Sequence, residues 1–386
     1  MALKAGYKHS EVGVIPEDWK DVSLGELAEI RMCKRIFSEQ TKSSGDIPFF
    51  KIGTFGSEPD SFISGELYRE YKRKYSFPKK GDILLSAAGT LGKTVVFDGG
   101  DAYFQDSNIV WLDINHSKIT NEYLYQCYQA IRWAAPEGST ISRLYNGIIL
   151  KTKIPLPPTA TEQRAIAQAL SDMDALLGAL DQIIAKKRDI KQATMQQLLT
   201  GKTRLPGFSG AWEEKRLGDV VQIIKGQLIT ENQAISGLIP VIAGGKKPAY
   251  FHNKSNREGK TITISASGAS AGYVAFFSEP IFASDCSTIS ESENYSIEFI
   301  YFLLQLKQEE IYKAQTGGAQ PHIHAADINP MEVSLPNNEE QTAIAAVLSD
   351  MDAELSALET RREKTRQLKQ AMMQELLTGK TRLKPA

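Results

Sequence analysis

The segment EQRAIAQALSDMDALLGALDQIIAKKRDIKQATMQQLLTGKTRL, residues 162–205, decides the fold, because it occurs again as EQTAIAAVLSDMDAELSALETRREKTRQLKQAMMQELLTGKTRL at residues 340–383. The two copies are identical at 29 of 44 positions without a gap. A second pair of similar segments lies upstream, around Trp19 and Trp212. Each repeated segment follows a longer, divergent stretch, which indicates a tandem repeat of one domain and one helix.

The repeated segments predict two long helices. Their apolar residues alternate at spacings of four and three, which is typical of the seam of a coiled coil. These positions are Ile166, Leu170, Met173, Leu177, Leu180 and Ile184 in the first copy, and Ile344, Leu348, Met351, Leu355 and Leu358 in the second. Gly201 and Gly379 can take the left-handed conformation that ends a helix. We expect the two helices to cover each other's seam as an antiparallel pair; the alternative is that each helix lies separately on its own domain.

The stretches before the helices predict two mainly-β domains. Short β-branched and aromatic runs bounded by turn residues are typical of strands, and one helical stretch follows them in each domain, at 121–133 and 297–314. The predicted class is α+β, with two globular mainly-β domains separated by an antiparallel pair of long coiled-coil helices in a pseudo-twofold repeat. The predicted boundaries are 1–158 for the first domain, 159–205 for the first helical spacer, 206–338 for the second domain and 339–386 for the second helical spacer.

Composition excludes several classes of protein. Of the 386 residues, 42% are hydrophobic and 24% are charged, which argues against disorder and a disulfide scaffold. The net charge of −1 argues against a uniformly basic nucleic-acid binder, so any basic face must be local. Cys33, Cys127 and Cys286 lie far apart in the sequence and are expected to be buried thiols. We find no apolar run typical of a signal peptide or a membrane span, so we expect a cytoplasmic protein.

Patterns that suggest catalysis are incomplete. The segment AAGTLGKT (87–94) resembles a phosphate-binding loop but has Ala87 where the pattern needs glycine. Pro59, Asp60, Glu70 and Lys72 follow the order of a nuclease motif that the second domain lacks. His322 and His324 have no third ligand at metal-binding spacing. We therefore expect no catalytic residue, metal site or cofactor in this chain.

The repeated anchors resemble the DNA-specificity subunit of type I restriction-modification systems. The segments that carry this resemblance are IPLPPTATEQ (154–163), ALSDMDALLGAL (169–180), residues 186–208, their second copies from Leu335 to Leu383, and the opening at residues 7–27. Membership would imply two target-recognition domains that read the halves of a bipartite double-stranded DNA site. It would also imply two partner modification subunits that methylate adenine with S-adenosylmethionine, and restriction/motor subunits that use ATP and Mg. The chain itself would be non-catalytic.

The resemblance directs attention to residues suited to DNA. Phosphate contacts need Lys and Arg, whereas base readout favours Arg, Lys, amides and small hydroxyls. The candidates in the first domain are Arg69, Lys72, Arg73, Lys74, Lys79, Lys80, Ser86, Gly89, Thr90, Lys93, Gln105, Asn108, Ser139, Thr140 and Arg143. The candidates in the second domain are Lys246, Lys247, Ser265, Ser267, Gly268, Gln320, His322 and His324. The basic run 68–80 is equally well interpreted as a solvated surface.

Two further hypotheses remain from the sequence. The chain could instead be a coiled-coil scaffold that joins two protein-binding domains without contacting DNA. The second hypothesis concerns the repeat junction: the Trp212 segment follows the first helix directly, and the Trp19 segment is its counterpart. We therefore expect the segment that follows the second helix to lie beside Trp19.

Overall fold

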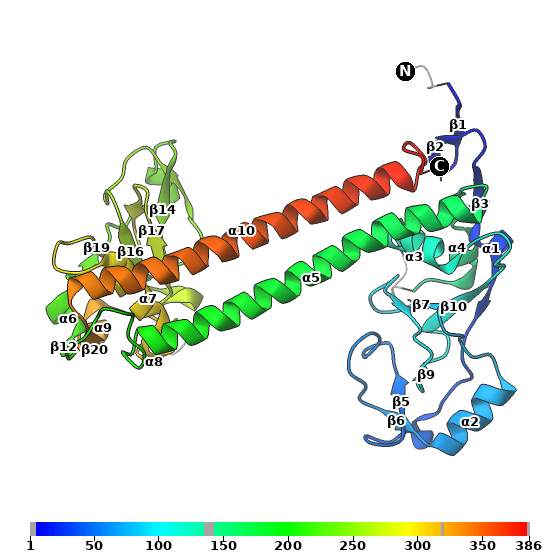
Figure 1. The fold of residues 1–386 in the computed structure, drawn as a ribbon, viewed down its shortest axis with the longest axis horizontal. Coiled ribbons are helices and arrows are strands. Elements are labelled where there is room, and N and C mark those ends of the chain that lie inside the picture. The colour runs from blue at the N-terminus through cyan, green and yellow to red at the C-terminus, as the bar shows by residue number, and fades with distance from the viewer. Residues whose placement is uncertain (1–4, 135–142, 318–319, 384–386) are drawn as a thin grey trace. The chain divides into compact units, whose positions relative to one another are not determined.

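The computed structural model describes residues 5–134, 143–317 and 320–383 (Figure 1). The chain forms two compact units, one of residues 1–179 with 362–386 and the other of residues 180–361. Each unit contains one globular domain and part of both long helices, α5 (Ala160–Leu198) and α10 (Asn338–Leu376).

The first unit contains a four-stranded antiparallel sheet, a smaller three-stranded sheet and two strand pairs. The four-stranded sheet has the order β4 (Ala28–Arg31), β10 (Ile109–Ile114), β7 (Ile83–Ser86), β8 (Thr94–Val96), and the three-stranded sheet has the order β6 (Phe62–Ile63), β5 (Ile47–Phe50), β9 (Tyr103–Phe104). The strand pairs are β1 (Tyr7–Ser10) with β2 (Gly13–Pro16), and β3 (Lys20–Ser23) with β11 (Lys153–Leu156). The helices are α1 (Leu24–Leu27), α2 (Gly65–Lys74), α3 (Asn121–Ala130) and α4 (Asn146–Lys151), with a 3-10 turn at Ser38–Gln40.

The second unit repeats both sheets and the β3–β11 strand pair, but its described residues form no counterpart of the β1–β2 pair or of α2. Its four-stranded sheet has the order β13 (Ile224–Lys225), β19 (Cys286–Ser290), β16 (Thr261–Ser265), β17 (Val274–Phe277), and its three-stranded sheet has the order β15 (Tyr250–His252), β14 (Ile239–Ile242), β18 (Phe282–Ala283). The strands β12 (Glu213–Arg216) and β20 (Glu332–Leu335) form a pair. The helices are α6 (Leu217–Val220), α7 (Ile297–Leu306), α8 (Gln308–Lys313) and α9 (Ala325–Ile328), with 3-10 turns at Glu231–Gln233 and Gly268–Ser270.

These elements confirm the predicted α+β class. The helix predicted at 121–133 is present as α3 but ends at Ala130, and the helix predicted at 297–314 is divided into α7 and α8. Strand pairing is mostly antiparallel, but β5 pairs with β9 and β14 pairs with β18 in parallel. Helix α2 was missed, because the tyrosines, lysines and arginines of residues 65–74 were interpreted only as a basic run. Its buried Tyr68 and half-buried Leu67 and Tyr71 pack on the core around β5 and β9.

The repeated Glu–Gln pair at the start of each long helix ties the helix to its domain. Thr159 Oγ1 accepts the amide of Glu162, and Asn337 Oδ1 accepts that of Glu340, so each helix has a side-chain cap. The next residue reaches the domain. Gln163 Oε1 accepts the amide of Thr120 at the start of α3, at 3.0 Å, as Gln341 does for Ser296 at the start of α7, at 3.1 Å.

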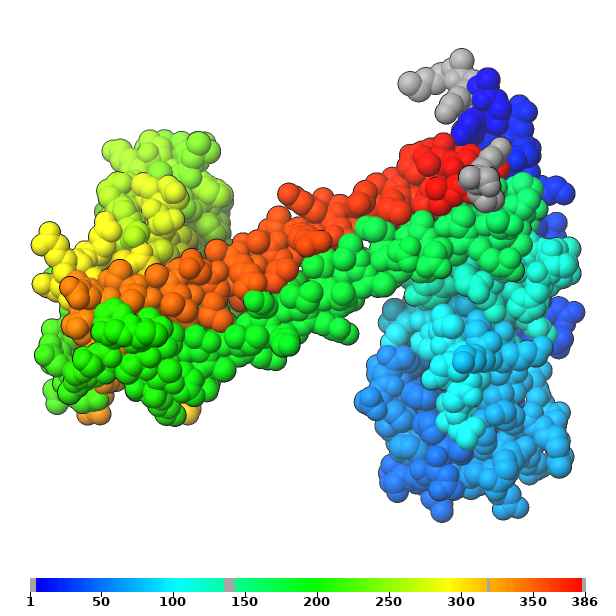
Figure 2. Space-filling view, in the orientation of Figure 1, coloured from blue at the N-terminus to red at the C-terminus, as the bar shows by residue number. Residues whose placement is uncertain are grey.

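The helices run antiparallel within each unit and pack side by side (Figure 2). In the second unit Lys187 pairs with Glu354 and Lys191 pairs with Asp352, so the partner number falls as the α5 number rises. In the first unit Lys369 of α10 pairs with Asp174 of α5, the repeat counterpart of the pair between Lys191 and Asp352. The predicted antiparallel arrangement is therefore present in each unit.

The predicted seam residues contact more than the other helix. Ile166 and Leu170 belong to the core of the first domain together with Leu376 and Leu377, which lie where α10 ends. Ile344 and Leu348 belong to the core of the second domain in the same way. The remaining predicted positions range from buried, as at Leu180, Ile184 and Leu355, to partly buried, as at Met173, Leu177, Met351 and Leu358. Each helix end thus packs on a domain, which the alternative interpretation also required.

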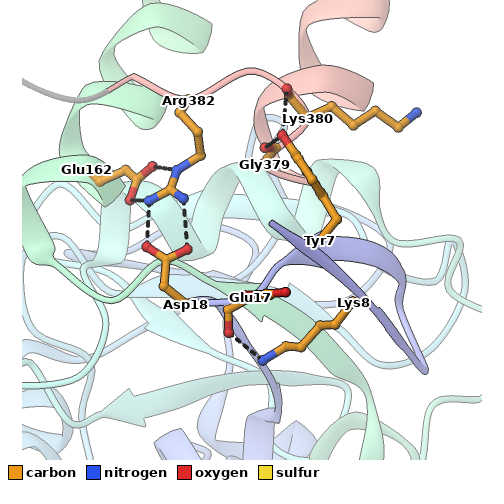
Figure 3. A network of polar contacts seen from close by, with 8 residues as sticks. All are labelled: Tyr7, Lys8, Glu17, Asp18, Glu162, Gly379, Lys380 and Arg382. Atoms are coloured by element: carbon orange, nitrogen blue, oxygen red, sulfur yellow. Dashed lines mark hydrogen bonds and ion pairs between the residues drawn. The ribbon is translucent and has the colours of Figure 1, made fainter. Parts of the chain in front are cut away.

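The segment after α10 contacts the segment around Trp19, as the repeat predicts (Figure 3). Tyr7 donates its hydroxyl to the carbonyls of Gly379 and Lys380. Arg382 donates to both Glu162 and Asp18, and its guanidinium lies 5.5 Å from the Trp19 ring.

The second unit builds the same junction within continuous chain. Arg204 donates to Glu340 and lies 5.7 Å from the Trp212 ring. Gly201 and Gly379 take φ values of 68° and 70°, which confirms the predicted left-handed helix ends.

The three cysteines lie in the cores of the two units. All three are free and buried, as predicted, and desolvation raises the pKa of each thiol to about 12. Among the described residues no group of three His, Cys, Asp or Glu side chains is placed to hold a metal ion. In the same part of the chain, every helix is too short or too polar to cross a membrane.

Candidate nucleic-acid interface

Three segments of the first domain meet where β7 and β10 join their loops. The amide of Ala87 donates to the carbonyl of Asn108 at 2.7 Å, and the amide of Leu144 donates to the carbonyl of Ala87 at 2.8 Å. Arg143 Nη2 donates to the carbonyl of Ser107 at 2.9 Å. These bonds bring together the candidates Ser86, Gly89, Thr90, Lys93, Gln105, Asn108 and Arg143, here termed the first loop cluster, in which Ser86 is buried.

The second domain forms the same arrangement from different residues. The amide of Ala266 donates to the carbonyl of Asp285 at 3.2 Å, and the amide of Ile323 donates to the carbonyl of Ala266 at 3.0 Å. Ser267 forms an isolated bridge with His322, as Ala88 does with Arg143. The structure thus brings Ser265, Ser267, Gly268, His322 and His324 together as the second loop cluster.

Side chains differ between the clusters although the backbone bonds match. In the first cluster Ser86 Oγ accepts the amide of Lys93 at 2.8 Å, and Lys93 Nζ donates to the carbonyl of Phe55. In the second, Ser267 donates to Asp285, and the rings of His322 and His324 stack with centroids 6.5 Å apart. One frame therefore presents two different sets of polar groups.

Glycine allows the turns that carry these side chains. Gly89 and Gly268 take φ values of 64° and 78°, and a Cβ at Gly268 would meet nothing within 4 Å. Gly92, with φ 79°, lies against the ring of Trp133, which a Cβ would approach to 2.0 Å. The segment that resembles a phosphate-binding loop is therefore a strand-to-strand turn from β7 to β8.

The remaining cationic candidates of the first domain lie elsewhere. Lys72 donates to Tyr68 Oη at 2.7 Å and lies 3.7 Å from Asp101, and Lys74 pairs with Glu70. Asp101 precedes β9, whereas the candidate Gln105 follows it. Likewise Lys79 and Lys80 precede β7, whereas Ser86 ends it. The structure therefore does not bring the basic residues of 69–80 to the loop cluster.

Other candidates have separate positions. Lys246 Nζ lies 5.2 Å from the Tyr273 ring, beside the turn that follows β16, and Lys247 is exposed. Gln320 is exposed and lies two residues before His322. Ser139 and Thr140 lie outside the described residues. Asp285 is not among the sequence candidates. It is the counterpart of Asn108, because Asn108 directly precedes β10 and Asp285 directly precedes the equivalent strand β19. This shared position before a strand is the signal that could have identified it.

Each unit also has a groove along a repeated helix face. In the first unit a groove of about 660 Å³ lies between α10 and the end of α3 with β11. In the second unit a groove of about 640 Å³ lies between α5, α10 and α7. The repeat residues that line both grooves are Arg188, Lys191, Gln192 and Met195, with their counterparts Arg366, Lys369, Gln370 and Met373.

Comparison with known proteins identifies the repeat. The family model of the type I restriction modification DNA specificity domain matches the chain twice, at residues 16–187 and 210–370. The chain belongs to this specificity family. The resemblance expected from the repeated anchors is therefore confirmed.

Individual relatives agree with this membership. A putative type I restriction enzyme specificity subunit of Haemophilus influenzae is 54% identical over 166 residues, which are 43% of each chain. A putative MjaX specificity subunit of Methanocaldococcus jannaschii is 26% identical over 98% of this chain and 97% of its own. The crystal structure of the type I S subunit of M. genitalium has the same fold, with a TM-score of 0.68 at 17% identity and 98% coverage of both chains.

Proposed function

We propose that the chain is the DNA-recognition subunit of a type I restriction-modification enzyme and reads a bipartite double-stranded target. The observation that carries this proposal is the pair of loop clusters, which share backbone bonds and differ in side chains. A common frame with different polar groups suits two domains that each read a different half-site, since base edges are distinguished by hydrogen-bonding groups. Phosphate contacts would position each domain without reading sequence.

The same proposal assigns the chemistry to partner subunits. Two modification subunits would bind S-adenosylmethionine and methylate adenine, and restriction/motor subunits would use ATP and Mg. The two grooves along the repeated helix face support a stoichiometry of two modification subunits, because one partner surface could dock in the same way on either unit. This chain would bind and orient the DNA, contribute no catalytic residue and act in the cytoplasm.

The test is to co-express the chain with its modification subunit in a host free of adenine methylation and to sequence the methylated sites. We expect methylation within one split sequence. Replacing residues 206–338 by the second domain of another family member should change one half of that sequence and keep the other. Methylation without sequence preference would overturn the proposal, as would a change in both halves.

A further inference from the structure

One position in the repeat carries an arginine in the first domain and a leucine in the second. In the four-stranded sheets Arg31 pairs with Trp111, and Ile224 pairs with Thr288, at matching places in β10 and β19. Further along the chain, the Phe37 amide donates to Gln40 Oε1 at 2.9 Å, and the Thr230 amide donates to Gln233 Oε1 at 3.0 Å.

Both of these matches have the offset of 193 that separates Trp19 from Trp212. The residues between them therefore correspond one to one. Arg35 and Leu228 occupy the same position of the repeat.

This position borders the loop cluster in each domain. Arg35 Nε lies 2.9 Å from Asp106 Oδ2, in the loop between β9 and β10 that also carries Asn108. The residues beside Leu228 are fixed at the end of β18 and on the equivalent loop that follows it: the Gln227 amide donates to the Ala283 carbonyl at 2.9 Å, and the Ile229 amide donates to Ser284 Oγ at 3.1 Å.

Both side chains point into solvent from these fixed backbones. The Arg35 side chain is 60% exposed although one nitrogen binds Asp106, and Leu228 is 75% exposed. A carboxylate behind a guanidinium restricts its orientation, which favours a bidentate contact. A leucine offers methyl groups and no hydrogen bond.

We propose that Arg35 and Leu228 are base-reading residues, with Arg35 contacting a guanine of the first half-site and Leu228 the C5 methyl group of a thymine in the second. Guanine presents two acceptors in the major groove that suit arginine, and thymine presents a methyl group that suits an apolar side chain. This inference rests on the proposed function and extends it to two residues outside the sequence candidates.

The thymine contact is tested with the complete modification complex and duplexes of its methylated target. Each thymine of the second half-site is replaced singly by deoxyuridine, which lacks only the methyl group. At one position the wild-type complex should bind about fourfold more weakly, the value for one buried methyl group. Leu228→Ala should bind the thymine and uracil duplexes equally. Leu238→Ala is the matched control: Leu238 is 91% exposed but precedes β14, away from the cluster, and the variant should respond to uracil as wild type does.

The guanine contact is tested by Arg35→Ala. Preference for guanine at one position of the first half-site should fall by ~5- to 150-fold, as expected when a bidentate contact is removed, while the second half-site stays unchanged. Lack of a uracil effect at every thymine, a second half-site without a required thymine, or unchanged guanine preference would overturn the inference alone. So would a Leu228→Ala variant that loses partner subunits but keeps its base preference, since the leucine would then bind protein. A wild-type complex with no sequence preference overturns the proposed function itself.

Discussion

Glu162 and Glu340 are buried carboxylates whose charges are matched by arginines from the end of the opposite helix repeat. The Glu162 and Glu340 side chains are 4% and 0% exposed, and Arg382 and Arg204 donate to them. A buried pair of this kind adds little net stability, but removing one partner leaves an uncompensated charge. These residues therefore make each junction sensitive to a single substitution.

Arg382→Ala should lower the free energy of unfolding by about 3–5 kcal/mol. The measurement is urea unfolding of the purified chain. Lys380→Ala, which changes an exposed neighbour, serves as the control and should have little effect. Adding Glu162→Gln to Arg382→Ala should restore part of the loss, because it removes the buried charge. A double variant as unstable as the single one would contradict this explanation.

Gly92→Ala should destabilise the first domain more than Gly89→Ala does. Both glycines have positive φ, which costs roughly 1–2 kcal/mol for other residues. At Gly92 the new Cβ would also collide with Trp133 at 2.0 Å, whereas at Gly89 the nearest atom is Ile52 Cγ1 at 3.4 Å. Thermal unfolding of the two variants tests this order, and equal melting temperatures would argue against the packing of Trp133 on the turn.

Among the elements, the long helices were predictable and α2 was not. Apolar residues recur at helical spacing from Ile166 to Ile184 in α5 and from Ile344 to Leu358 in α10, and neither 39-residue helix contains a proline, so the helical pattern is hard to mistake. The three-stranded sheets rely on strands of two to four residues and on a parallel pair between distant segments, which local patterns do not encode. The loop clusters were partly predictable from glycine and hydroxyl content. The positions of Lys79 and Lys80 were not, because they depend on which end of β7 faces the loops.

We expect helix α2 to contact DNA phosphates even though it lies apart from the first loop cluster. Arg73→Ala with Lys74→Ala should then weaken binding to all sequences equally and lower the salt slope by about 0.9 for each phosphate that the helix no longer neutralises. Lys72 is left unchanged, because its interactions with Tyr68 and Asp101 hold the helix. Binding isotherms of the complex at several salt concentrations measure the slope. An altered base preference would assign α2 a reading role instead.

The grooves along α5 and α10 predict separable docking of two modification subunits. Gln192→Arg and Gln370→Arg each place a bulky cation in one groove at repeat-equivalent positions. Each variant should retain one modification subunit, and the double variant should retain none. Native mass spectrometry of the co-expressed complex gives the stoichiometry. Gln374→Arg in the first groove is a second variant there, and two retained subunits in all variants would exclude the grooves as docking sites.

At the scale of the whole molecule, Tyr7 and Asp18 contact residues 379–382, so the segment after the second long helix is joined to the start of the first domain; we call this arrangement the closed repeat. A circular permutant opened within residues 201–210 and joined between the segments at 383 and 7 should fold and assemble, because the new junction replaces an existing one. We expect unchanged methylated sites in the sequencing assay. The control is a permutant opened within β16, which breaks the core sheet and should be insoluble. A target-blind permutant opened at 201–210 would contradict the closed repeat.

The bonds that hold the loop clusters together have a consequence for evolution. Ala87, Asn108 and Leu144 in one domain, and Ala266, Asp285 and Ile323 in the other, are joined through main-chain groups that almost every amino acid supplies. Mutations can therefore exchange the neighbouring side chains while the loops keep their shape. New DNA preferences can arise by drift in one domain, without passing through unstable intermediates and without altering the inherited preference of the other.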